Sequence, residues 1–193
     1  MRRAALTVLF VGALALTGCT SSAPTPVAAP TVEPATPAAT PDATAPAAET
    51  STRGNLVKTV GQTFGATDPV TGDQVANFRV TAITVDPACT GEYASASDNG
   101  HFVKLDVEGE TLPELGEDIY LTGWNVIAEN GTTFNGLAES GASSMCLGFN
   151  EQLPIRIGPG ERVAGSIVLD VPTASGVLVL PFGGGAWEWS YPQ

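Results

Sequence analysis

The sequence predicts an all-β fold for residues 54–193, on two observations. No stretch of eleven or more residues there repeats its apolar positions with the 3.6-residue period of an amphipathic helix. Short runs of β-branched and aromatic residues instead alternate with clusters of Gly, Pro, Asn and Asp, at intervals of about ten residues. About seven or eight short strands with this spacing indicate an antiparallel β-sandwich.

The first predicted strand covers residues 75–85, which read VANFRVTAITV. We expect a β-bulge within it, because its apolar positions do not keep one alternation throughout. On this interpretation one face carries Phe78, Val80 and Ala82, and the other carries Ile83 and Val85.

Residues 101–108 form the next strand, because their polar and apolar residues alternate. Val103, Leu105 and Val107 then face the core of a half-buried antiparallel sheet. A strand over residues 119–128 follows, and the chain turns at residues 129–132, where an Asn-Gly pair readily adopts positive φ. Residues 132–134 return beside that strand. The turn also matches the glycosylation sequon Asn-Gly-Thr, but we prefer the turn interpretation.

Four more strands complete the predicted sandwich, at residues 153–157, 163–171, 177–182 and 186–191. Turns at residues 158–161 and 172–176, rich in Gly, Pro and Ser, separate them. Within residues 163–171 the alternation places five residues on one face: Val163, Gly165, Ile167, Leu169 and Val171.

The N-terminus has the features of an export signal. Arg2 and Arg3 precede an apolar run over residues 4–16, which is shorter than the about 20 residues that span a bilayer. The letters LTGC follow and end at Cys19, which resembles the bacterial lipobox. This resemblance implies that residues 1–18 are a cleaved lipoprotein signal peptide and that Cys19 carries a diacylglycerol anchor. An ordinary cleaved signal and an uncleaved anchor are the alternatives.

Residues 19–53 form a linker that begins at the lipidated Cys19. It consists mostly of Pro, Ala, Thr and Ser, so it buries too little apolar surface to offset its ordering entropy. We expect a disordered stalk that holds the folded domain away from the membrane. Its Thr-Pro richness also resembles O-glycosylated stalks, and a passive tether is the other interpretation.

Two cysteines remain for the domain, Cys89 and Cys146. In an exported domain two cysteines most simply form one disulfide. Two free thiols and a metal site with two sulfur ligands are the alternatives.

The net charge of −12 excludes several kinds of partner. Residues 54–193 hold 17 of the 20 acidic residues and five of the eight basic ones. A domain this acidic lacks the basic face that nucleic acid requires, and it does not adsorb to anionic lipid. A single histidine excludes a metal site with several histidines.

Three segments resemble actinobacterial surface lipoproteins with an immunoglobulin-like domain of unknown function, a family related to the mycobacterial immunoprotective extracellular antigen. They are FRVTAITVD at residues 78–86, WNVIAENGTTFN at 124–135 and IGPGERVAGSIVLDVP at 157–172. The resemblance covers nearly all of residues 54–193, and its motifs are strands and turns. It implies an immunoglobulin-like antiparallel β-sandwich outside the cell, and no catalytic residues.

Candidate catalytic and metal-binding residues are few. His101 is the only histidine available to a Ser-His-Asp hydrolase, and no G-x-S-x-G elbow accompanies it. Several carboxylates follow one another and could ligate calcium, although their spacing is not that of an EF-hand. A glycosidase pair and a solvated acidic surface are the other interpretations. The carboxylates are Asp106, Glu108, Glu110, Glu114, Glu117 and Asp118.

The aromatic C-terminus is the remaining candidate for ligand binding. Alternation places Trp187, Trp189 and Tyr191 on one face, after three successive glycines. These rings either fill the core of the sandwich or form an exposed platform for a sugar or peptide.

We therefore expect a non-enzymatic protein without a cofactor, lipid-anchored to the outer face of the cell membrane. Its Ig-like domain would serve recognition, adhesion or interaction with a protein or glycan of the cell envelope. A carbohydrate- or small-ligand-binding lipoprotein that uses the aromatic face or an inter-sheet cleft is the second hypothesis. A secreted hydrolase is the third.

Overall fold

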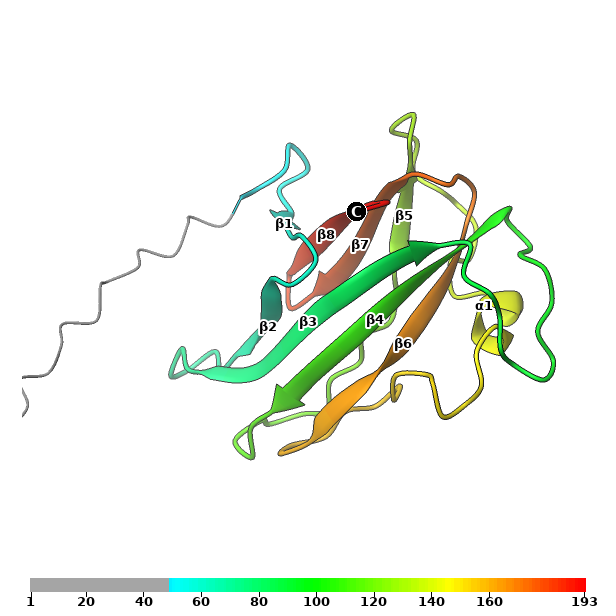
Figure 1. Ribbon diagram of the computed structural model, residues 1–193. Coiled ribbons are helices and arrows are strands. Elements are labelled where there is room, and N and C mark those ends of the chain that lie inside the picture. Colours follow the sequence, from blue (N-terminus) through cyan, green and yellow to red (C-terminus); the bar gives the residue numbers. More distant parts are fainter. Residues whose placement is uncertain (1–48) are drawn as a thin grey trace, which may run out of the picture. The chain divides into compact units, whose positions relative to one another are not determined.

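The computed structural model describes residues 49–193, which form two four-stranded sheets (Figure 1). One sheet has the order β1-β8-β7-β5 and the other β2-β3-β4-β6. All neighbouring strands are antiparallel except β1 and β8. The strands are β1 (Leu56–Val57), β2 (Thr63–Thr67), β3 (Gln74–Val85), β4 (His101–Thr111), β5 (Asn125–Ala128), β6 (Arg162–Val171), β7 (Gly176–Phe182) and β8 (Gly185–Tyr191).

Six of the eight strands have the order of an immunoglobulin-like sandwich. When β3, β4 and β6 are assigned as strands A, B and E, their sheet has the order A-B-E. Strands β5, β7 and β8 then correspond to C, F and G, which are neighbours in the opposite sheet. Between residues 49 and 193 no strand takes the place of D. The predicted all-β sandwich is therefore confirmed.

The predicted signal peptide over residues 1–18, the predicted lipidation site Cys19 and the predicted linker up to residue 48 lie outside the described residues. From residue 49 onward, no helix is long and apolar enough to cross a bilayer.

The bulge in β3 changes which of its residues face the core. The register with β4 shifts between Val80 and Ala82, so Thr81 is the extra residue. Beyond it the alternation restarts, and Ile83 and Val85 join Phe78 and Val80 on the core side. The sequence-based assignment of Ile83 and Val85 to the opposite face is therefore wrong, because one inserted residue reverses every later side chain.

The prediction of a strand at residues 153–157 is also wrong. Of the strand predicted at residues 119–128, only β5 (Asn125–Ala128) forms. Ile119 and Ile157 form only an isolated bridge. Pro154 has no N–H to donate, and Leu153 donates its N–H to Ser166 of β6. These residues therefore form a loop that covers the edge of β6.

The predicted turn at residues 129–132 is confirmed, with Gly131 at φ 81° and a hydrogen bond from the Ala128 N–H to the Thr132 carbonyl. Three short elements were not predicted. They are β1, β2 and α1 (Gly141–Met145), which were too short to show a period.

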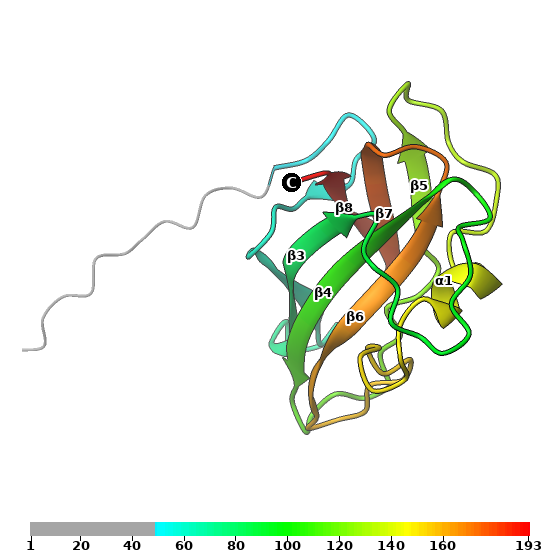
Figure 2. The same cartoon turned by 45° about the vertical axis from the view of Figure 1, so that its right-hand side comes forward.

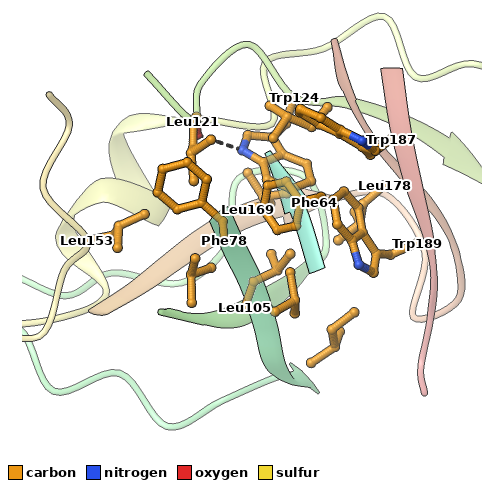
Figure 3. Close-up of a cluster of buried hydrophobic side chains, with 14 of the residues drawn as sticks. Phe64, Phe78, Leu105, Leu121, Trp124, Leu153, Leu169, Leu178, Trp187 and Trp189 are labelled. Atoms are coloured by element: carbon orange, nitrogen blue, oxygen red, sulfur yellow. Dashed lines mark hydrogen bonds between the residues drawn. The ribbon is translucent and has the colours of Figure 1, made fainter. Parts of the chain in front are cut away.

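The core between the sheets is built on aromatic rings (Figure 3). The Phe64 ring lies 5.1 Å from the rings of both Trp187 and Trp189. Trp124 packs 5.6 Å from Trp189 and donates its indole N–H to the Leu121 carbonyl. Strands of both sheets contribute to this cluster, so it joins the two layers.

The segment before β1 contacts the domain. Residues 49–57 fold back on themselves, with the Val57 N–H donating to the Glu49 carbonyl. Arg53 donates two hydrogen bonds to the buried carboxylate of Glu188 in β8, and Asn55 donates a third. Burial raises the pKa of Glu188. The hydrogen bonds from Arg53 and Asn55 and the positive charge of Arg53 outweigh this effect of burial, so the pKa of Glu188 lies below its ordinary value. The segment before β1 is therefore attached to β8.

Candidate functional site

Two long connections lie together beside β6 (Figures 1 and 2). One is residues 86–100, between β3 and β4, and the other is residues 129–161, between β5 and β6. Connections beyond about 12–15 residues are uncommon in compact domains and often carry function. We call the surface that these two connections form the loop face.

The disulfide between Cys89 and Cys146 joins the two connections, which confirms the predicted pairing. The N–H groups of Thr90 and Gly91 both donate to the Cys146 carbonyl. A Cβ at Gly91 would lie 2.1 Å from the Met145 carbonyl oxygen, so only glycine allows the two connections to approach so closely.

A buried carboxylate in β6 also binds both connections. Asp170 is fully buried and accepts hydrogen bonds from the Ser97 hydroxyl and from the N–H groups of Asp98 and Asn99. Ser140 of the other connection donates its hydroxyl to the same carboxylate at 2.7 Å. Asp170 therefore fixes both connections to the sheet.

Ser140 has a second role at the start of α1. Its hydroxyl accepts a hydrogen bond from the Ser143 N–H at 3.0 Å, as an N-cap residue does. The short helix α1 is thus tied to Asp170 through Ser140 and to the disulfide through Cys146.

Apolar side chains project from this braced surface. Met145 at the end of α1 is 44% exposed, Phe149 86% and Ile155 72%. Phe149 lies in a turn in which the Glu151 N–H donates a hydrogen bond to the Gly148 carbonyl. Beside Ile155 is a hollow of about 200 Å³, which we call the β6-edge hollow. Its lining includes Glu139, Leu147, Leu153, Pro154, Ile155 and Val168.

A second, larger hollow of about 670 Å³ opens where β2 ends and β4 leaves its sheet. Its walls include Glu114, Glu117, Tyr120 and Phe182. Its volume falls in the range of about 300–1,000 Å³ that is typical of small-molecule sites. This hollow is therefore large enough for the small ligand of the second hypothesis.

The three aromatic residues of the predicted platform are buried. Trp187 is 8% exposed, Trp189 0% and Tyr191 2%. All three belong to the main core cluster, because β8 pairs with β7 and turns this face toward the opposite sheet. The core interpretation therefore holds, and no exposed platform forms from these residues.

His101 lies at the start of β4, with its Nδ1 2.9 Å from the Asp86 carboxylate. Ser97, the nearest hydroxyl along the chain, donates to Asp170 instead. Among residues 49–193 no hydroxyl forms a hydrogen bond with the His101 ring. The arrangement thus contains a base and its orienting acid, but no nucleophile positioned against them.

The candidate calcium ligands are not gathered into one site. Asp106, Glu108 and Glu110 each pair with a different base, namely Lys104, Arg79 and Arg162. Asp118 pairs with Arg156. In the described part of the chain no three acidic, histidine or cysteine side chains are placed to hold a metal ion.

The sequence analysis missed Asp170 and the exposed apolar residues of the loop face. Asp170 sits in a strand whose opposite face carries the predicted core, so the pattern marks it as solvent-facing. Ile155 was assigned to the strand predicted at residues 153–157. For Phe149, which stands between Gly148 and Asn150, the available signal was a large apolar residue in a loop rich in Gly and Ser.

No family model matches this chain, and no curated protein matches it. Among solved structures, the chain is similar to a protein of Clostridium difficile 630 described as an uncharacterized beta-sandwich protein. The identity is 11% and the TM-score 0.35, and the match covers 74% of this chain and 96% of that chain.

Proposed function

We propose that this protein is a non-enzymatic, lipid-anchored binding module on the outer face of the cell membrane. It recognises a protein of the cell envelope or surface through the loop face. The observation that carries the proposal is the group of exposed apolar side chains, Met145, Phe149 and Ile155, on connections braced by a disulfide and a buried carboxylate. Exposed apolar residues on a rigid support are typical of protein interfaces.

Three features favour a protein over the other partner classes. The domain is strongly acidic, which disfavours nucleic acid. The tryptophans that could stack on a sugar are buried. On the loop face, the β6-edge hollow of about 200 Å³ is smaller than the about 300–1,000 Å³ of small-molecule sites, but it suits one side chain of a larger partner. The hollow of about 670 Å³, which has the size of a small-molecule site, is lined by neither of the two connections.

The anchor is tested with Cys19→Ala in the full chain. We expect the wild-type protein in the membrane fraction and the variant in the medium, because the sulfur that would carry the lipid is gone. Thr20→Ala, one residue further on, is the control and should remain in the membrane fraction. Membrane retention of Cys19→Ala would contradict the lipid anchor.

The recognition role is tested by placing a photo-crosslinking amino acid at Phe149 in cells. We expect a covalent adduct with a second protein, because this side chain is 86% exposed on the loop face. Val70 is 91% exposed in the turn between β2 and β3 and serves as the matched control. Adducts at both positions, or at neither, would argue against the loop face as the recognition surface. Ile155→Asp should abolish an adduct formed through this face.

A further inference from the structure

The outer edge of β6 is paired at Ser166 and at Asp170, and it is open between them. The Ser166 N–H donates to the Glu151 carbonyl, and the Ser166 carbonyl accepts from Leu153. Four residues further on, the Asp170 N–H donates to the Ala138 carbonyl. Backbone groups of a strand alternate in direction, so the even-numbered residues of β6 point their N–H and C=O away from β4.

Val168 lies between these two paired positions. Its N–H and C=O point outward by the same alternation, and within residues 49–193 neither has a hydrogen-bond partner. Val168 also lines the β6-edge hollow. The hollow therefore offers one backbone donor and one backbone acceptor beside apolar walls. This combination matches the main chain of a residue in an extended peptide.

The length of the open edge limits what can bind there. Residues 151–153 cover β6 on one side of Val168, and residue 138 covers it on the other. A long strand therefore cannot pair along β6. The hollow of about 200 Å³ is lined by Leu147, Leu153 and Ile155, among others, and one residue with an apolar side chain fits these limits.

The charge around the hollow defines the neighbours of that residue. Glu139 lines the hollow, and Glu151 precedes its lining residue Gln152. The lining contains no lysine or arginine. Arg156, the base next to Ile155 in the chain, is paired with Asp118 at 2.6 Å. The field at the hollow therefore favours positive charge on the partner.

We infer that the β6-edge hollow receives a single apolar residue from an extended, basic segment of the partner protein. The backbone of that residue pairs with the N–H and C=O of Val168. Its side chain packs on Leu153 and Ile155, and a flanking lysine or arginine lies near Glu139. This inference rests on the proposed function and adds the chemistry of the partner segment to it.

The test uses the full-length protein in detergent and a labelled peptide, Ala-Lys-Ala-Leu-Ala-Lys-Ala. We expect saturable binding by fluorescence polarisation. Methylating the backbone nitrogen of the central leucine should weaken binding about 3- to 10-fold, the equivalent of one hydrogen bond. Replacing both lysines with glutamate should abolish it. Ile155→Asp and Glu139→Gln should each weaken binding, whereas the matched controls Val70→Asp and Glu114→Gln should not.

A second measurement separates edge pairing from unspecific apolar contact. Binding should slow hydrogen exchange at the Val168 amide and leave the amide of Ala164, outside the hollow, unchanged. Equal affinity for the methylated peptide, or an unaffected Val168 amide, would overturn the inference. So would absence of peptide binding in a protein that still forms the Phe149 adduct, which leaves the proposed function intact. Absence of that adduct counts against the proposed function itself.

Discussion

Replacing Asp170 with alanine is expected to lower the free energy of unfolding by about 3–5 kcal/mol. The fully buried carboxylate accepts hydrogen bonds from two backbone N–H groups, those of Asp98 and Asn99. It also accepts from the hydroxyls of Ser97 and Ser140. Removing the acceptor leaves these donors without a partner, and each buried unsatisfied group costs about 1–3 kcal/mol.

Urea unfolding followed by tryptophan fluorescence measures this effect. Asp73→Ala, at an exposed position in the turn before β3, is the matched control and should change stability by less than about 0.5 kcal/mol. Equal stability of Asp170→Ala and the wild type would show that Asp170 does not hold the two connections to the sheet.

The pKa of Asp170 determines how the stability difference between wild type and Asp170→Ala depends on pH. Burial, the largest single influence, raises the pKa of Asp170, but the hydrogen bonds from Ser97, Ser140, Asp98 and Asn99 together hold that pKa below its ordinary value. The folded pKa is thus below the unfolded value of about 3.9, so the carboxylate stabilises the fold above that pH. This stabilisation is lost as the pH falls through the folded pKa. The difference between wild type and Asp170→Ala should be constant at neutral pH and shrink below about pH 4.

Removal of the disulfide, in the double variant Cys89→Ala/Cys146→Ala, is expected to lower the free energy of unfolding by about 4 kcal/mol. The two cysteines are 57 residues apart, so the bond restricts a long loop in the unfolded chain. Urea unfolding with and without a reductant measures this change. Reductant should destabilise the wild type by a similar amount and leave the double variant unchanged. A wild type that is insensitive to reductant, although its thiols become free, would contradict the predicted contribution.

Several elements could be predicted from the sequence because their signal is local. Strand β4 was predicted from the alternation of Val103, Leu105 and Val107, and all three are buried. Strands β6, β7 and β8 were predicted close to their observed bounds for the same reason. The pairing of Cys89 with Cys146 needed only a count of cysteines, and the turn at Gly131 needed only an Asn-Gly pair.

The candidate site could not be predicted in the same way. Alternation in β6 marks Asp170 as a solvent-facing residue, because the opposite face holds Leu169 and Val171. It is buried only because residues 97–99 and Ser140, distant in the chain, cover it. Ile155 shows the reverse case, an apolar residue that a strand prediction would bury but that a loop leaves exposed.

The sequence by itself determined the class of fold, most of its strands and the disulfide, but it left the C-terminal aromatic residues open between a core role and an exposed platform. Each of these depends on residue type and on spacing within one segment. Only the tertiary structure decided the face of Ile83, the burial of Asp170 and the open backbone position at Val168. These depend on one inserted residue or on contacts between distant segments. The alternation of residues within a single strand contains no information on either.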